Sequence, residues 1–331
     1  MGGLTLTIIT NRASSLNYGE TMGNVSVLKK VTLGDGTQRT FVSDKALKYD
    51  IRRKGREEKG WRLLDRKLEE YVKGNLREFT DGKKKSIKLD VDTFGKNLVK
   101  EYEEFDLFGG LFTNLKGVRA LSYGDSVKRT CPVKVTYAFS VSDFKGDMNF
   151  LNNIEAYNRY IKHVEDKAEQ AIPQMEEHTS HYVYTLTVDL DRIGVWEKED
   201  GSCEVVIENK ERAKRVKDLL DIIKTLNRQI KGRWENLSPV FAVGGLFETK
   251  HPFFMGSVEA SEINGKLVLD VRRLKEAADM IPEGERNKVV VGLMSGIFAN
   301  EEEIRREFDV KSVGEVFEKL KEEVDRYYGS S

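Results

Sequence analysis

The sequence contains little cysteine, histidine or proline. Its 331 residues include two cysteines, four histidines and five prolines. Cys131 and Cys203 are too few and too far apart for a disulfide framework or a zinc knuckle, and a reducing cytoplasm suits them. No basic stretch with a long apolar run opens the chain, and no window is apolar enough for a membrane span. We therefore expect a cytoplasmic protein with no membrane contact.

Neither sign of charge dominates, because 55 Lys and Arg residues balance 55 Asp and Glu residues. A charged fraction of 33%, rich in Lys and Glu, is typical of thermophile proteins and predicts a thermophilic source. Locally the balance differs: Leu28 to Lys88 holds 19 basic and 10 acidic residues, whereas acidic residues gather from Glu301 onward. Either a basic face of one copy meets an acidic face of the next, or both runs are solvated helix faces.

Hydrophobic patterning predicts several elements of secondary structure in the first half of the chain. Alternation predicts strands over 4–10 and 132–141, the latter with Val133, Val135, Tyr137, Phe139 and Val141 on one side. Residues 11–36 read as an irregular polar loop and 81–88 as a turn. Ser43 and Asp44 offer an N-cap for a helix, with helical spacing continuing from Trp61 to Val72. A further helix is expected over 93–104, whereas 106–112 contains two glycines and cannot be a regular helix.

The second half continues with a polar excursion over 142–181, helical near 158–171, and a strand over 182–188. Asn209 is expected to cap a long amphipathic helix, followed by strands over 240–243, 266–271 and 288–293 and by closing helices. The order predicts an α+β fold with a ferredoxin-like βαββαβ core, which is also the frame of the RNA-recognition motif. We expect one domain over 1–331, with large insertions at approximately 11–130 and 142–180.

Catalytic and cofactor signatures are weak. His178 and His181 lie three residues apart just before a strand, without a carboxylate-rich motif, and structural hydrogen bonding is the simpler interpretation. The pairs Gly109–Gly110 and Gly244–Gly245 lack the residues that complete a phosphate-binding loop. We expect no metal, no cofactor and no enzymatic activity.

A basic surface for nucleic acid is better supported. Lys29 and Lys30 lie in the early loop, and Lys45, Lys48 and Arg52 share one face of the predicted helix by their spacing. Arg53, Lys54 and Arg56 add further cations nearby. Such a face can follow consecutive phosphates. The alternative is an ordinary solvated helix face.

Three segments resemble a known family. Residues 15–20 with Gly23–Asn24 and Lys29–Lys30, then residues 43–52, resemble the opening of the DevR-type CRISPR-associated autoregulators, the backbone subunits of type I Cascade complexes, particularly type I-B. Asp106–Leu107–Phe108–Gly109–Gly110 is similar to the acidic-Leu-Phe-Gly loop of that family. Lys128–Arg129 and residues 289–293 also fit it.

The resemblance implies a palm like an RNA-recognition motif, with insertions called fingers (11–130) and thumb (142–180). It implies that copies pack head to tail along a CRISPR RNA, which pairs with target DNA within the assembled complex beside other Cascade subunits. The implied RNA contacts are Asn17, Lys29, Lys30, Ser43, Lys45, Arg52, Arg53, Phe108, Gly109 and Gly110, with Met148 as a thumb residue that displaces a base or, alternatively, packs under its own loop.

Two other functions remain open. Related type III backbone subunits cut RNA with an aspartate in a loop near the start, where this chain has Asp35 within Gly34–Asp35–Gly36–Thr37, a sequence typical of a hairpin turn. The historical family name suggests a transcriptional regulator, although the sequence contains no evident helix-turn-helix.

Overall fold

A mixed β-sheet forms the centre of the molecule. The computed structural model describes residues 2–81, 84–113, 126–150, 154–163, 174–198 and 200–329. Among these, the largest sheet has nine strands. Their order is β25 (Val310–Ser312), β24 (Val290–Leu293), β21 (Pro239–Phe247), β1 (Gly3–Thr10), β16 (Tyr182–Asp189), β12 (Ala138–Ser140), β6 (Gln38–Val42) and β5 (Lys30–Thr32), and β11 (Val133–Val135) also pairs with β16.

The predicted βαββαβ order is present in this sheet. Helix α1 (Asp44–Lys59) follows β1 in the chain, and α6 (Asn209–Lys224) connects β16 to β21. The strands β21, β1, β16 and β12 are neighbours in that order and all pair antiparallel. This is the arrangement of a ferredoxin-like core, with β5 and β6 added at one edge and β24 and β25 at the other.

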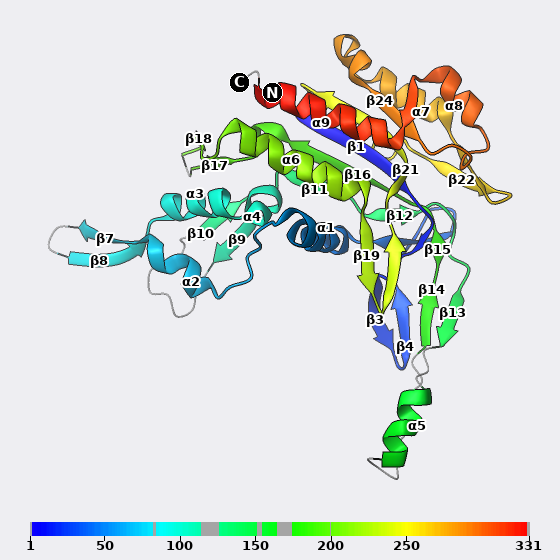
Figure 1. Cartoon of the computed structure of the whole chain (residues 1–331), viewed down its shortest axis with the longest axis horizontal. Coiled ribbons are helices and arrows are strands. Elements are labelled where there is room, and N and C mark those ends of the chain that lie inside the picture. Colours follow the sequence, from blue (N-terminus) through cyan, green and yellow to red (C-terminus); the bar gives the residue numbers. More distant parts are fainter. Residues whose placement is uncertain are drawn as a thin grey trace.

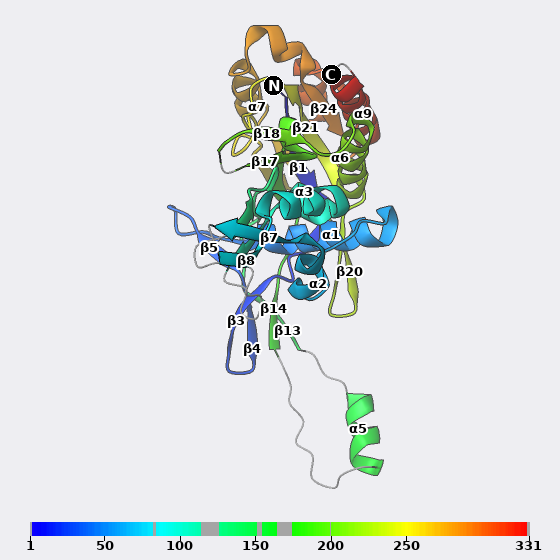
Figure 2. The ribbon, with the colours of Figure 1, turned by 90° about the vertical axis from the view of Figure 1, so that its left-hand side faces the viewer.

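A layer of three helices covers one face of the sheet. Helices α1, α6 and α9 (Val313–Gly329) bury their apolar sides against alternate residues of β1 and β16, including Leu4, Leu6, Tyr184 and Leu186. Figure 2 shows α6 and α9 on one side of the strands and α7 on the other. The alternate apolar residues of the strands therefore pack against the apolar faces of the helices in one core.

The opposite face is covered over only part of its width. Helix α7 (Val271–Asp279), α8 (Glu301–Glu307) and the β22–β23 hairpin (Ala260–Ile263, Lys266–Leu269) pack on β21 and β24 around Phe241, Val243 and Val291. Beyond this cover, on β12 and the residue before it, the large side chains of Tyr137 and Phe139 are exposed. These side chains form part of a groove described below.

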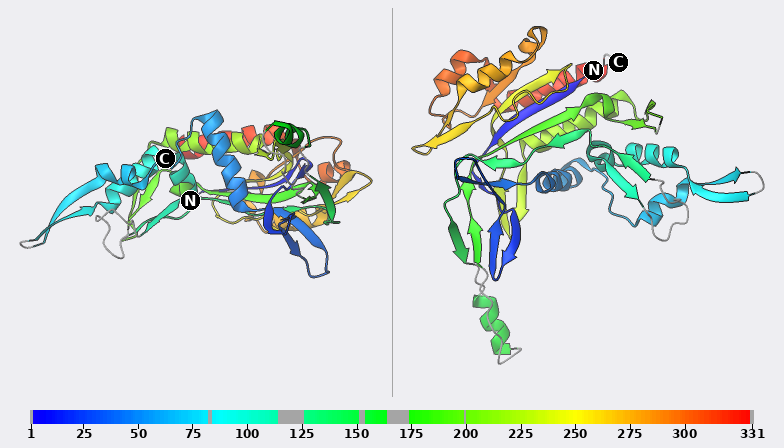
Figure 3. Two further views of the ribbon diagram at one scale, coloured as in Figure 1. Left: turned by 90° about the horizontal axis from the view of Figure 1, so that it is seen from below. Right: turned by 180° about the vertical axis from the view of Figure 1, so that it is seen from behind.

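Two groups of elements project from the core on either side of α1 (Figure 1). One, here called the arm, holds the strands β3 (Tyr18–Met22), β4 (Val25–Leu28), β13 (Asp147–Phe150), β14 (Gln174–Glu177), β19 (Asn227–Ile230) and β20 (Arg233–Asn236), with α5 (Ile154–His163) beyond its end. Short strands β2 (Ala13–Ser14) and β15 (Thr179–Ser180) lie at its base. Figure 3 shows the same projection from below and from behind.

The other group, here called the lobe, follows α1 in the chain. It contains α2 (Leu68–Val72), the hairpin β7–β8 (Leu76–Asp81, Lys84–Leu89), α3 (Val91–Glu101), α4 (Glu103–Phe108), and β9 and β10 (Gly110–Thr113, Ser126–Arg129). Its own small core packs Phe94, Leu98, Phe105 and Trp196, the last from the adjacent hairpin β17–β18 (Val195–Glu197, Cys203–Val205). The predicted insertion 11–130 therefore includes part of the arm, the core helix α1 and the lobe.

Several local predictions were wrong. Residues 11–36 contain strands β2 to β5 instead of an irregular loop, and Lys84–Leu89 is a strand instead of part of a turn. Helix α1 ends at Lys59 because Gly60 takes a left-handed conformation with φ 70°. Of the helical region predicted from Trp61 to Val72, only the short helix Leu68–Val72 is α-helical. Asp106 to Phe108 are helical, but α4 ends there and β9 begins at Gly110, so 106–112 is not one regular helix, as predicted. Asn209 is the first residue of α6, and the cap residue before it makes no side-chain cap bond.

The strand predicted over 132–141 is broken in two, with a consequence for the side chains. Val133, Val135 and Ala138 all pack in the helix-side core, which requires a one-residue shift between β11 and β12. Such a shift moves every following side chain to the other face. Tyr137, Phe139 and Val141 therefore face away from the helix layer, not the same way as Val133.

Candidate nucleic-acid interface

The early segment is fastened to the start of α1. The Ser43 hydroxyl accepts a bond from the Ala46 amide at 3.3 Å and so caps the helix. The Ser43 amide donates to Asn17 Oδ1 at 2.8 Å, and the Lys29 amide donates to the Asn17 carbonyl at 2.9 Å. The structure thus brings Asn17, Lys29 and Ser43 together at a helix N-terminus, a place with favourable dipole and amides for an anion.

The cations of α1 are mostly engaged in ion pairs. Lys45 is exposed and forms no ion pair among the described residues. The others pair with carboxylates: Lys48 with Asp44, Arg52 with Glu104, Arg53 with Glu57, Lys54 with Glu58, Arg56 with Asp65, and Lys59 with Asp221. Pairs whose side chains reach the surface, such as Arg52–Glu104 and Arg56–Asp65, contribute about 0–1 kcal/mol each, so a phosphate can compete for them, whereas the Lys54 side chain is buried.

Two predicted contact residues are held more firmly. The Lys30 ammonium lies 2.7 Å from Glu176 and 4.2 Å from the centre of the Phe144 ring. Glu176 also accepts the Leu28 amide at 2.7 Å, so this group ties β14 to the early strands. Arg53 donates to both oxygens of Asn227, at 2.8 and 2.9 Å, and ties α1 to the start of β19. Both cations are therefore used in holding the arm to the core.

The Phe-Gly-Gly loop lies beside the C-terminal half of α1. Phe108 is buried in the main core, with its ring 6.5 Å from that of Trp61. Gly109 has φ 69° and ψ −172°, and a Cβ there would lie 2.3 Å from the Arg129 carbonyl oxygen. Only glycine fits this backbone and this approach. Gly110 then begins β9, so Gly109 and Gly110 present backbone, and Phe108 does not present its ring.

Asp106, at the start of this motif, is the centre of a buried ion-pair cluster. Its carboxylate is fully buried and accepts from Arg129 at 2.6 Å, Arg215 at 2.8 Å and the Gly194 amide at 2.8 Å. Burial lowers the pKa of Arg129, opposed by Asp106. Sequence reasoning missed this cluster because Arg129 and Arg215 lie far from Asp106 in the chain. The acidic residue of the motif therefore holds α4, β10 and α6 together.

Met148 lies on the arm, in strand β13. It is 43% exposed and stands opposite Glu176 across the β13–β14 pairing. Glu176 itself pairs with Lys30 and accepts the Leu28 amide, so Met148 lies on the sheet to which the early segment is bonded.

Comparison with known proteins decides the family. Residues 5–261 match the family described as "CRISPR-associated negative auto-regulator DevR/Csa2". The chain belongs to the DevR/Csa2 family. Two solved structures titled "CRISPR RNA-guided surveillance complex", one of them pre-nicking, contain chains of similar fold. The pre-nicking one has TM-score 0.56 and 11% identity over 99% of both chains, and the other has TM-score 0.52 and 14% identity over 96% of this chain and 98% of that one. No curated protein matches the sequence.

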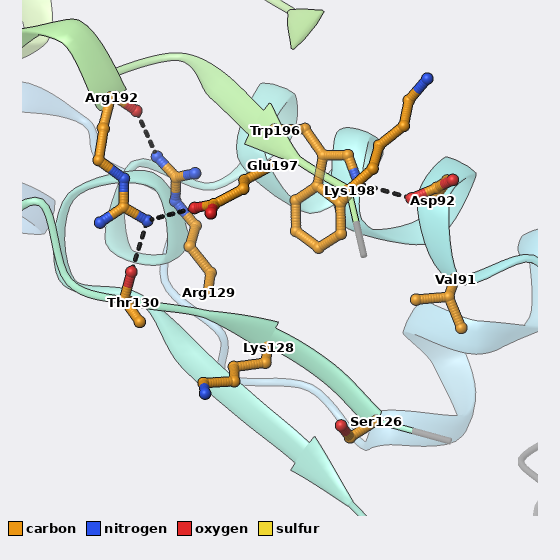
Figure 4. A pocket seen from close by; sticks show the side chains of 10 residues that line it. All are labelled: Val91, Asp92, Ser126, Lys128, Arg129, Thr130, Arg192, Trp196, Glu197 and Lys198. Atoms are coloured by element: carbon orange, nitrogen blue, oxygen red, sulfur yellow. Dashed lines mark hydrogen bonds and ion pairs between the residues drawn. The ribbon is translucent and has the colours of Figure 1, made fainter. Parts of the chain in front are cut away.

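The DevR/Csa2 chain also has a cavity of about 550 Å³ beside the lobe (Figure 4). Lys128, Arg192 and Lys198 line it together with Trp196, whose indole donates to Asp92 at 2.9 Å. Arg192 is paired with Glu197 at 3.2 Å. Among these three cations, the family resemblance included only Lys128. Arg192 and Lys198 lie next to or within the β17–β18 hairpin, outside the segments that carry the resemblance.

The remaining titratable candidates have structural partners. His178 Nδ1 lies 2.7 Å from the Thr40 hydroxyl, His181 Nδ1 lies 2.8 Å from the Thr10 carbonyl oxygen, and burial lowers the pKa of both rings. Asp35 lies in the predicted turn, between β5 and β6, and accepts the Thr37 amide at 2.9 Å. That bond and a second one from the Thr37 hydroxyl lower the Asp35 pKa. Within the described ranges, no three metal-ligating side chains gather, and no helix is long and apolar enough to cross a membrane.

Proposed function

We propose that this DevR/Csa2 protein is a non-catalytic subunit that binds CRISPR RNA, several copies of which line the guide in a type I Cascade complex. One observation carries the proposal. The family match over 5–261 includes the early segment, α1 and the Phe-Gly-Gly loop, and these are the parts that the fold gathers around α1. Family membership supports a role in CRISPR defence, and the gathering of these segments around α1 supports an RNA surface there.

The proposed contact is with phosphates and does not depend on the identity of the bases. Lys45, in the first turn of α1, and Lys29, in the segment bonded to Asn17, form no ion pair with any residue that the structure describes, and the helix start supplies a positive dipole end. Arg52 can exchange its carboxylate partner for a phosphate. A surface built this way binds any spacer sequence, as a guide carrier requires.

The proposed partners are CRISPR RNA, further copies of the chain, other Cascade subunits and, within the assembled complex, target DNA. The likeness in fold to chains of CRISPR RNA-guided surveillance complexes supports this setting. The proposal needs no cofactor and places the complex in the cytoplasm. The thermophilic source stays a prediction.

A salt titration tests the RNA surface. Lys29→Ala with Lys45→Ala should weaken binding of every single-stranded RNA alike and reduce the slope of log K against log salt by about 1.4, since each phosphate contact on a single strand contributes about 0.7. Lys210→Ala with Lys266→Ala is the matched control, because these lysines are exposed and form no ion pair within the described residues. An unchanged slope in the first variant would contradict the proposed surface.

The arm supplies a separate test. Removing Asp147 to Asn149, which includes Met148, should leave RNA affinity largely intact but disturb the regular protection pattern of a guide bound by many copies. The expectation rests on the placement of Met148 on the arm strand β13, where its uncharged side chain adds no cation to the phosphate contacts. Loss of affinity equal to that of the double lysine variant would place Met148 among the phosphate contacts instead.

An endonuclease is the first alternative. The Asp35 carboxylate is bound by Thr37 in a tight turn, which favours a structural role over metal binding. Asp35→Ala should therefore leave any cleavage of guide-complementary RNA unchanged with and without Mg²⁺. Loss of a metal-dependent cut in this variant would assign the chain to the cleaving class.

A transcriptional regulator is the second alternative, favoured by the family description "negative auto-regulator". A gel-shift comparison separates it from the main proposal. Preferential binding of duplex DNA over single-stranded RNA of the same sequence would favour the regulator, and sequencing of RNA that co-purifies with the protein would favour the guide carrier.

A further inference from the structure

Three adjoining cavities form one groove over the uncovered half of the sheet. The middle cavity, of about 470 Å³, shares Arg39, Val141 and Glu259 with a neighbour of about 530 Å³. On its other side it shares Thr136, Thr185 and Met255 with a cavity of about 330 Å³. The two outer cavities have no lining residue in common. The groove therefore runs along the sheet, with the middle cavity between the other two.

Aromatic side chains form the floor of the middle cavity. Tyr137 is 44% exposed and Phe139 is 37% exposed. The Tyr137 ring stacks on Phe41 at 4.9 Å with an angle of 6° between the planes, and Phe139 lies 5.7 Å from Phe41. Phe41 and Phe139 are opposite each other across the β6–β12 pairing. The three rings thus hold one another in place and leave two of them open to a flat ligand.

The acidic groups of the groove have partners, whereas two of its lysines form no ion pair within the described residues. Its lining carries five acidic groups, and each has a partner: Asp143 with Arg39, Glu259 with Arg273, Glu262 with Arg12, Asp189 with Lys250, and Asp270 as the cap of α7. Lys134 and Lys145 line the two outer cavities, are exposed, and form no ion pair within the described residues. The charges left for a ligand are therefore cationic and lie on both sides of the aromatic floor.

We propose that this groove binds a single-stranded nucleic-acid segment, with an unpaired base stacked on Tyr137 and Phe139 and its flanking phosphates at Lys134 and Lys145. Stacking on aromatic side chains between cations is the usual means of binding single strands without reading their sequence. The groove lies on the face of the sheet opposite α1, so it is separate from the proposed guide surface and does not depend on it.

A protein segment fits this place less well. A peptide that added to the sheet would need a free strand edge, but β12 is bonded to β16 on one side and to β6 on the other. An acidic partner would have to meet lysines that lie in two separate cavities. A strand of nucleic acid spans such a distance with regularly spaced phosphates.

Cross-linking of the full-length protein tests the proposal. Fluorescein-labelled 12-residue oligonucleotides, 4-thiouridine RNA and 4-thiothymidine DNA in separate arms, are irradiated and the linked peptides are identified by mass spectrometry. We expect links to Tyr137 or Phe139, and the arm with more linkage tells whether RNA or DNA is the preferred strand. Links confined to other parts of the chain overturn the proposal.

Variants separate this groove from the guide surface. Tyr137→Leu with Phe139→Leu should weaken oligonucleotide binding roughly tenfold, the effect expected of one lost base stack, and Lys134→Glu with Lys145→Glu should do so without touching the rings. Lys210→Glu with Lys266→Glu is the charge control. In Lys29→Ala with Lys45→Ala protein the groove links should persist, so failure of the guide surface and failure of the groove are distinguishable.

Sedimentation of the same variants tests the alternative that a second copy of the chain occupies the groove. If the Tyr137 and Phe139 changes abolish self-association and leave oligonucleotide affinity and cross-links unchanged, the groove is a contact between copies and the proposal is wrong. Loss of cross-links at unchanged sedimentation supports it.

Discussion

The buried carboxylate of Asp106 allows a quantitative test of how the lobe is joined to the core. Asp106→Ala removes the shared partner of Arg129 and Arg215, whose side chains are 2% and 1% exposed. Neither guanidinium can reach water without moving an element, and neither can lose its charge at neutral pH. The substitution therefore leaves the buried charge of Arg129 without the Asp106 carboxylate, whereas Arg215 keeps Glu211 at 3.2 Å and Glu103 at 3.9 Å.

The magnitude follows from those contacts. Removing one partner of a buried ion pair costs about 3–5 kcal/mol, because the remaining charge stays desolvated. Arg129 keeps its bond to the Arg192 carbonyl at 2.8 Å and Arg215 keeps that to Val99 at 2.7 Å, so the two losses should not simply add. We expect the free energy of unfolding to fall by about 3–5 kcal/mol, a large part of the 5–15 kcal/mol typical of a domain.

Urea unfolding followed by circular dichroism measures this change. Asp106→Asn should fall between the alanine variant and the parent, since the amide still accepts the Gly194 bond but carries no charge. Asp325→Ala is the control: its pair with Lys217 is exposed and should contribute about 0–1 kcal/mol. If Asp106→Ala loses no more stability than Asp325→Ala, the reasoning about the buried cluster is refuted.

Two further predictions concern pH and backbone. Burial holds the pKa of His178 and His181 below the ordinary 6.5, so the unfolded chain takes up protons on these rings before the folded protein does. The free energy of unfolding should therefore be independent of these rings above pH 6.5 and should fall on acidification, by at most about 1.4 kcal/mol per pH unit for each ring. Replacing both rings by Asn should flatten urea midpoints between pH 7.5 and 5.5, and an equally steep fall would point to other groups. Gly109→Ala should cost about 1–3 kcal/mol because of its φ and the close carbonyl, whereas Gly314→Ala, in the first turn of α9, should be neutral or stabilising by thermal melting; equal melting temperatures would contradict the strain argument.

The core of the fold was predictable because its signals are local. Alternation over Leu4–Thr10 and Tyr182–Val188 marked β1 and β16, and the apolar stripe from Ala213 to Ile223 marked α6. These segments are elements of ordinary length with clear apolar periodicity, which is the main signal for secondary structure. The order of such elements then gave the βαββαβ core.

The surface was less predictable because its state depends on partners distant in sequence. Lys30 and Arg52 are paired with Glu176 and Glu104. Neither carboxylate is close to its partner in the sequence, so sequence spacing could not predict these pairs. Tyr137 reads as a core residue in a continuous strand, and only the shift before β12 turns it outward. The strand Lys84–Leu89 is hidden by its lysines, since β-propensity is weak for Lys and cross-strand pairing decides.

The pairing of the α1 cations with the protein's own carboxylates has a consequence for assembly. Exchange of an internal carboxylate for a phosphate releases fewer counterions from the nucleic acid than contact with a bare lysine does, because the freed carboxylate then attracts cations of its own. A single copy should accordingly hold a strand weakly, and many copies side by side should hold it tightly through the summed small gains of each. Length of the strand, more than the quality of any one contact, would then decide whether the chain stays bound.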